Sequence, residues 1–132
     1  MKKIIIQGTD LQKKIFYTAL YHTMVQPNTM SDVNGEYMAS DYVTRSVAKG
    51  EVHYSTFSLW DTFRALHPLM TIIDPDLNNH FINSLIKKHQ EGGIYPMWDL
   101  ASNYTGTMIG YHAVPVIVDA YMKGYRNFDA KE

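Results

Sequence analysis

The segment from Asp74 to Gly93 constrains the fold of this chain more than any other part of its sequence. Asp74 and Pro75 form a strong helix start, because aspartate is a preferred N-cap and proline fits the first helical turn. Gly92 and Gly93 form a typical stop signal. The apolar residues between these signals fall on one helical face: Phe81, Ile82, Leu85 and Ile86. We therefore predict a helix over 75–92 with one buried side.

Two helices are predicted ahead of this segment. The first runs from about Asp10 to Thr23, because Thr9 and Gln12 fit a capping box. The second should weaken at Pro68, since proline removes a hydrogen-bond donor and clashes with the preceding turn. The apolar side of this second helix is formed by Leu59, Phe63 and Leu66.

A fourth helix is predicted to begin at about Met108 and to run through His112 to Gly124, with a kink at Pro115. Asn103 and Thr105 are plausible N-caps for it. The helix is apolar nearly all round, which is typical of a helix buried by neighbours. Its main apolar positions are Met108, Ile109, Val114, Val116, Ile117, Val118 and Ala120.

The chain from Asn127 to Glu132 fits an N-cap and a single turn of a fifth helix. One turn cannot support itself, because nucleation is unfavourable. We therefore interpret residues 1–132 as a single partial domain, truncated at its C-terminal end, from a larger all-helical domain.

The parts outside these helices are irregular. Residues 1–8 contain three consecutive isoleucines and predict a short N-terminal strand. Residues 24–55 lack periodicity and are interrupted by Pro27, Gly35 and Gly50, with room for short hairpin strands around the two glycines. Compact domains rarely keep so long an irregular segment unless it is functional or covers a site.

Composition excludes several classes of function. The formal net charge is -1, and no dense lysine and arginine stripe occurs, so we expect no nucleic-acid partner. No apolar run is long enough for a membrane span or a signal peptide. The absence of cysteine excludes disulfides and thiolate chemistry but leaves the compartment undetermined. No phosphate loop, nucleophile elbow or zinc signature is present.

Two Trp-Asp pairs, Trp60-Asp61 and Trp98-Asp99, contain the only tryptophans. An indole can stack on the apolar face of a sugar ring while a neighbouring carboxylate binds its hydroxyls, so such a pair is a minimal sugar site. Arg64 lies at i+3 from Asp61, a spacing that permits a salt bridge. The alternative is a structural ion pair beside a core tryptophan, and such pairs are common.

Two further residues have a structural and a functional interpretation. Asn103 is either a helix cap or a binder of sugar hydroxyls, and the cap is favoured. A single helix histidine such as His112 is usually a hydrogen-bonded packing residue, and it lacks recognisable metal-binding partners. Residues 32–36 superficially resemble a calcium loop, but their spacing favours a turn.

Three long runs resemble family 92 glycoside hydrolases, the calcium-dependent exo-acting α-mannosidases of bacteria. They are Phe16–His22 (FYTALYH), Phe57–Pro68 (FSLWDTFRALHP) and Met108–Pro115 (MIGYHAVP). Members have an N-terminal β-sandwich and a helical (α/α)₆ toroid. The resemblance implies an all-α fragment of that toroid, with about four helices, a short N-terminal strand and small hairpins between the first two helices.

The resemblance implies inverting hydrolysis of terminal α-mannosides, of the α-1,2 type, with a Glu acid and an Asp base roughly 6.5–9.5 Å apart. Calcium holds the mannose 2- and 3-hydroxyls. These groups belong mostly to later toroid segments, so we assign no catalytic or metal-binding residue here and expect the isolated chain to be inactive and to bind no calcium alone.

Carried over by position, Trp60 and Asp61 resemble the mannose-contacting residues of the -1 subsite, and Trp98 resembles a second aromatic wall. Arg64 would hold Asp61, with Asn103 and His112 as supporting residues. The family more often has Trp-Glu where this chain has Trp98-Asp99, which leaves the role of Asp99 open.

The expected partners are mannose-containing glycans and the remainder of the catalytic domain. Exposed apolar helix faces also allow self-association. The family indicates a periplasmic, cell-surface or secreted location, although these residues contain no export signal. The competing hypothesis is a non-catalytic helical module that binds sugars or a protein partner.

Overall fold

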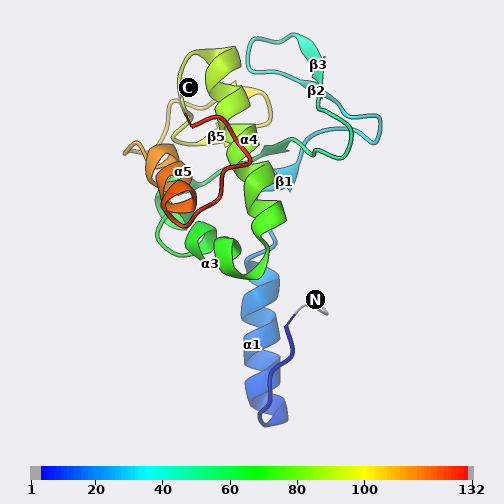
Figure 1. Cartoon of the computed structure of the whole chain (residues 1–132), viewed down its shortest axis with the longest axis vertical. Helices are drawn as coiled ribbons and strands as arrows, with labels where there is room; N and C mark the ends of the chain where they lie inside the picture. The colour runs from blue at the N-terminus through cyan, green and yellow to red at the C-terminus, as the bar shows by residue number, and fades with distance from the viewer. Residues whose placement is uncertain (1–3, 131–132) are drawn as a thin grey trace.

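The computed structural model describes residues 4–130 and has five helices joined by loops and three small two-stranded antiparallel sheets within that range (Figure 1). The helices are α1 (Asp10–His22), α2 (Leu59–Thr62), α3 (Leu66–Ile73), α4 (Pro75–Gly92) and α5 (Ala113–Met122). The strands are β1 (Asn28–Thr29), β2 (Glu36–Met38), β3 (Thr44–Ser46), β4 (Tyr54–Ser55), β5 (Asp99–Leu100) and β6 (Asn103–Tyr104).

Helix α4 is the centre of the molecule, and its predicted bounds are confirmed. The Asp74 side chain accepts a hydrogen bond from the Leu77 N–H, Pro75 occupies the first turn, and Gly93 ends the helix with φ +80°. Its apolar face packs against α3 and α5. The buried core contains Phe57, Leu59, Met70, Phe81, Ile82, Leu85, Ile86, Ala113, Val116, Ile117 and Ala120.

Beside its apolar face, α4 carries three polar side chains at i, i+4 and i+7, each of which binds a different segment of the chain. Ser84 accepts a hydrogen bond from the Tyr54 N–H at 2.9 Å. Lys88 is buried against Asp99. Glu91 accepts hydrogen bonds from the Tyr37 hydroxyl and the Ser40 N–H. We call Ser84, Lys88 and Glu91 the polar row of α4.

Helix α1 begins with the predicted capping box and projects from the body of the molecule, burying only Leu20 (Figure 1). The predicted N-terminal strand is wrong for its described residues, 4–8, which have no strand partner. They run beside α1, where the Tyr17 hydroxyl donates to the Ile4 carbonyl. A strand needs a hydrogen-bonded neighbour, and α1 offers none. Residues 1–3 of the prediction lie outside the described residues.

The predicted second helix is two helices, because the backbone leaves the helical region at Ala65, with φ -139° and ψ -58°. The expected weakening at Pro68 is wrong. Pro68 is the third residue of α3, and a proline in the first turn removes no intrahelical donor. Helix α3 therefore continues to Ile73.

Helix α5 begins at Ala113, five residues later than predicted, because Met108 and Gly110 have φ +68° and +87°, which no right-handed helix accommodates. Pro115 again lies in a first turn, where it needs no kink. The predicted turn of helix after Asn127 is absent from residues 127–130, which have no regular structure. Residues 131–132 of that prediction lie outside the described residues.

The predicted hairpins in residues 24–55 are confirmed, although their turns lie elsewhere. Strands β2 and β3 are joined by residues 39–43, and Gly35 and Gly50 flank this hairpin. Strand β1 pairs with β4 and closes the segment at its base. Within residues 4–130, no helix combines the length and apolar character that crossing a membrane requires.

Candidate functional site

Trp60 and Asp61 lie together on α2 and are both accessible. The Trp60 side chain is 40% exposed, although its neighbour Leu59 is fully buried. Asp61 is exposed, and its carboxylate accepts a hydrogen bond from the Ser58 hydroxyl. An accessible indole beside an accessible carboxylate can bind the apolar face and the hydroxyls of a sugar ring.

Arg64 supports the indole of Trp60 and does not form an ion pair with Asp61 in the described part of the chain. Its guanidinium lies 5.8 Å from the centre of the Trp60 ring and 5.1 Å from that of Phe63. It also donates a hydrogen bond to the Trp60 carbonyl at 3.1 Å. The expected role of Arg64 in holding Asp61 is therefore wrong, because the carboxylate is held by Ser58.

The backbone brings the two Trp-Asp segments together. Ser58, which precedes α2, forms an antiparallel β-bridge with Trp98. The Trp98 carbonyl accepts hydrogen bonds from both the N–H and the hydroxyl of Thr105. Trp98 is half-buried and is held beside the start of the helix that carries Trp60.

Asp99 has an environment opposite to that of Asp61. It is 2% exposed and forms a buried ion pair with Lys88, with Oδ2 and Nζ 3.0 Å apart. Its carboxylate also accepts hydrogen bonds from the Ser55 hydroxyl and from the N–H groups of Thr56 and Phe57. The Asp99 carboxylate is therefore engaged within the protein and is not available to a ligand.

Asn103 and Thr105 are not helix caps, because the N-cap position of α5 is His112. Asn103 lies in β6, where its side-chain carbonyl accepts a hydrogen bond from the Tyr42 hydroxyl. It lines a pocket of about 150 Å³ that also contains Lys88 and Asp99. Asn103 thus links the β2–β3 hairpin to the segment that follows Trp98.

His112 is half-buried and packs against Phe63, with ring centres 4.2 Å apart. This contact joins the start of α5 to the turn that carries Arg64. Gly110 lies two residues before His112 and packs against its ring, so that a Cβ at Gly110 would overlap the imidazole. The structure therefore places His112 beside the α2 turn as a packing residue.

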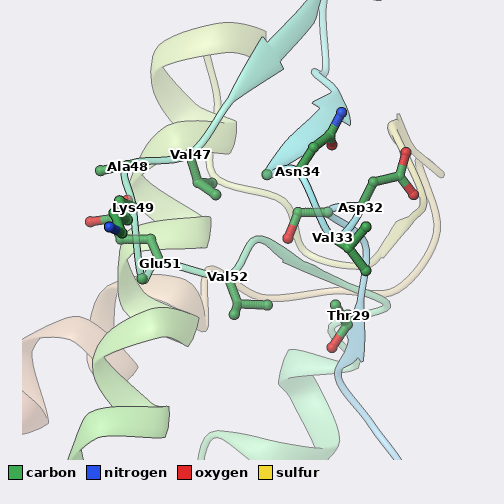
Figure 2. A pocket seen from close by; sticks show the side chains of 12 residues that line it. Thr29, Asp32, Val33, Asn34, Val47, Ala48, Lys49, Glu51 and Val52 are labelled. Carbon is green, nitrogen blue, oxygen red and sulfur yellow. The ribbon is translucent and has the colours of Figure 1, made fainter.

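A larger pocket, of about 610 Å³, lies away from these residues. Its walls come from residues 29–35 and 47–52, on either side of the β2–β3 hairpin (Figure 2). Residues 32–36 form the predicted turn, in which the Gly35 N–H donates to the Asp32 carbonyl. None of the candidate sugar-site residues lines this pocket.

The described residues do not by themselves fit a metal ion. Within residues 4–130, no group of three or more His, Cys, Asp or Glu side chains is arranged to hold one. We therefore assign no calcium-dependent step to the side chains of this segment.

The sequence interpretation missed Ser58, Lys88 and Gly110. A signal existed for Lys88, because Phe81, Leu85 and Lys88 are spaced i, i+4 and i+7 and so share the buried face. A lysine on such a face needs a buried partner. No local pattern distinguishes Ser58 or Gly110, since their roles depend on contacts with Trp98 and His112.

Comparisons with known proteins give consistent results. The family profile described as the glycosyl hydrolase family 92 catalytic domain matches residues 1–132. The structure is similar to that of the family GH92 α-mannosidase BT3965 from Bacteroides thetaiotaomicron, with a TM-score of 0.91 and 33% identity, covering 98% of this chain and 18% of that one.

Two further solved structures are similar. The same enzyme in complex with mannoimidazole has a TM-score of 0.85 and 35% identity, covering 91% of this chain and 16% of that one. The family GH92 inverting mannosidase BT2199, from Bacteroides thetaiotaomicron VPI-5482, has a TM-score of 0.83 and 34% identity, covering 97% and 17%. The chain thus spans less than a fifth of the length of these structures. A search of curated proteins found no significant match.

Proposed function

Because the chain belongs to glycosyl hydrolase family 92, we propose that it is part of the catalytic domain of an α-mannosidase that hydrolyses terminal α-mannosides with inversion. The similar solved structures support this, since one is an α-mannosidase and another is an inverting mannosidase. We further propose that the helices belong to an (α/α)₆ toroid and that the linkage cleaved is of the α-1,2 type.

The observation that carries the proposal for this segment is the accessible Trp60-Asp61 pair on α2. We assign the stacking face to Trp60 and the hydroxyl contacts to Asp61. Arg64 orients the indole, and Trp98 forms a second aromatic wall beside Ser58. Asn103 supports this wall through its hydrogen bond with Tyr42. His112 supports the α2 turn through its contact with Phe63.

We assign the general acid, the general base and the calcium ligands to segments outside this chain. Inverting hydrolysis needs two carboxylates on opposite faces of the sugar, with a water between one of them and the anomeric carbon. Asp99 cannot serve, because its oxygens are occupied by Lys88, the Ser55 hydroxyl and the N–H groups of residues 56 and 57. The chain alone should therefore release no mannose, and mannose release by the purified chain would contradict this division of roles.

The partner of this segment, in this proposal, is the remainder of the catalytic domain. Large apolar side chains are exposed on α1 and α5, which suits helices that pack against further helices. They include Leu11, Ile15 and Tyr21 on α1 and Val118 and Met122 on α5.

Binding of methyl α-mannoside to the isotope-labelled chain, followed by NMR, tests the proposal. We expect the indole N–H signal of Trp60 to shift with methyl α-mannoside and to shift far less with methyl α-glucoside, which differs in the 2-hydroxyl. Trp60→Ala should weaken binding at least about tenfold, because the stacking face is lost. Asp61→Asn should weaken binding because the hydroxyls lose a charged acceptor.

Tyr121→Ala provides the matched control, because Tyr121 is 39% exposed, as Trp60 is 40% exposed, but lies on α5. It should leave binding unchanged. Equal binding of both sugars, or full binding by the Trp60→Ala chain, would refute the assignment of the subsite.

A further inference from the structure

The carboxylate of Asp99 binds three consecutive residues of one turn, 55–57, and pairs with Lys88. Its Oδ1 accepts from the Phe57 N–H at 3.0 Å. Its Oδ2 accepts from the Ser55 hydroxyl at 2.6 Å and from the Thr56 N–H at 3.3 Å, and lies 3.0 Å from Lys88 Nζ. Three consecutive residues are thus bound to a single side chain.

That turn is strained and immediately precedes the candidate sugar site. Thr56 has φ +67°, a left-handed conformation that a β-branched residue rarely adopts. One residue after the turn, Ser58 pairs with Trp98, and α2 then begins at Leu59. The position of Trp60 therefore depends on the position of residues 55–57.

Lys88 connects Asp99, and through it the turn at residues 55–57, to the central helix. It belongs to the central helix α4, its side chain is 4% exposed, and its Nζ also donates to the Ala101 carbonyl at 3.4 Å. A buried ion pair is a poor source of stability compared with apolar packing, because both charges lose their hydration. The contribution of this ion pair is to orientation, since its charge-assisted hydrogen bonds fix residues 55–57 relative to α4.

We propose that Lys88 and Asp99 are positioning residues for the mannoside subsite: they fix the turn at residues 55–57 and thereby set Trp60 and Asp61 opposite Trp98. This inference rests on the proposed function for its ligand, but its structural part is independent of any ligand. Neither residue touches the sugar. The ion pair determines how well the subsite is formed before the sugar arrives.

The test compares Asp99→Asn with the unmodified chain by NMR. We expect the Trp60 indole signal to shift or broaden, and the Phe57 amide to exchange with solvent at least about tenfold faster, because an acceptor of the turn is weakened. Affinity for methyl α-mannoside should fall at least about tenfold. Asp99→Glu, which keeps the charge, should recover part of both effects.

Glu51→Gln is the matched control. It breaks the ion pair between Glu51 and Lys87, the neighbour of Lys88 on α4, where the two side chains are 32% and 28% exposed. It should leave the Trp60 signal and the affinity unchanged. If Asp99→Asn does not fold, Ser55→Ala replaces it. This change removes one donor to Asp99 and the contact of the same hydroxyl with the Ala101 carbonyl. A smaller effect in the same direction is then expected.

The outcomes separate this inference from the proposed function. If the unmodified chain binds no mannoside, the proposed function fails, and the indole signal and amide exchange alone decide the positioning role. If a folded Asp99→Asn chain, or Ser55→Ala in its place, keeps the Trp60 signal and Phe57 protection of the unmodified chain, the positioning role is refuted. An equal response to Glu51→Gln would also refute it.

Discussion

At the scale of single residues, Gly110 is the described glycine at which an added Cβ would come closest to another atom. Its φ of +87° favours glycine, and a Cβ there would overlap the imidazole of His112. We expect Gly110→Ala to destabilise the chain by about 1–2 kcal/mol for the backbone and by about 1–3 kcal/mol more for the overlap. Urea denaturation measures this loss, and the NMR signals of Phe63 should shift as His112 moves.

Gly106→Ala is the control for this prediction. Gly106 has φ +67°, but a Cβ there would meet nothing within 4 Å. It should show the backbone penalty alone. Equal losses for the two variants would mean that the contact between His112 and Phe63 does not depend on Gly110.

The two aspartates that follow tryptophan show what a residue pattern can and cannot predict. Asp61 and Asp99 each follow a tryptophan, yet one is exposed and the other is 2% exposed. The difference arises from Lys88 on α4 and from residues 55–57, which lie more than 40 residues before Asp99 in the sequence. The pattern therefore proposed both pairs alike as sugar-binding candidates, and only the tertiary fold distinguishes their environments.

At the scale of elements, each residue of the polar row of α4 binds a different segment of the chain. Glu91 accepts from the Tyr37 hydroxyl at 2.6 Å and from the Ser40 N–H at 3.3 Å, so it fixes the β2–β3 hairpin. Burial is the main reason that the pKa of Tyr37 is raised above its usual range, and the hydrogen bond with Glu91 is the second. We expect Glu91→Ala to speed hydrogen exchange in residues 36–46, at a local free-energy cost of about 1–3 kcal/mol, with little change at Trp60.

Glu36→Gln is the matched control within the hairpin, because the Glu36 carboxylate is exposed and bonds only the Asn34 side chain among the described residues. It should leave exchange in the hairpin unchanged. A uniform loss of protection throughout the Glu91→Ala chain would show instead that the hairpin is not a separate cooperative unit.

Helices with explicit start and stop signals were predictable, whereas those that depend on loop geometry were not. Thr9 with Gln12, and Asp74 with Gly93, are local signals that the structure confirms. The start of α5 depends on positive φ angles at Met108 and Gly110, which apolar periodicity does not reveal. Prolines in the first turns of α3 and α5 were interpreted as breaks because the preceding boundaries were misplaced.

At the scale of the whole molecule, two buried histidines make stability depend on pH. His53 and His67 are both 1% exposed. Burial, with smaller effects of Lys88 and Lys87, lowers the pKa of His53 to about 3. Burial also lowers the pKa of His67 to about 4, although the neighbouring Asn78 side chain opposes the shift. Both imidazoles are therefore neutral in the folded chain at neutral pH.

The direction of this pH dependence follows from the difference in proton binding between the unfolded and the folded chain. Below about pH 6.5 the unfolded chain protonates both histidines, whereas the folded chain does so only near pH 4 and pH 3. Stability should therefore be unaffected by these groups above about pH 6.5 and should fall below it, by up to about 1.4 kcal/mol per pH unit for each histidine. Urea denaturation between about pH 7.5 and pH 4.5 measures this dependence.

The variant His67→Phe should reduce the slope over that range, because one of the two groups is removed and phenylalanine suits the aromatic surroundings of Phe57 and Phe81. The exposed His22 offers the control, and His22→Gln should keep the slope. An unchanged slope in His67→Phe would show that other groups cause the pH dependence.

The polar row of α4 also bears on how sequences of this kind can diverge in length. A residue inserted between Ser84 and Lys88 would rotate everything after it by about 100° around the helix axis. Lys88 and Glu91 would then face away from Asp99 and Tyr37 while Ser84 still met Tyr54. Insertions and deletions should therefore accumulate in the loops and be excluded from α4. The length of this helix should stay constant, because it sets the spacing of the segments that the polar row binds.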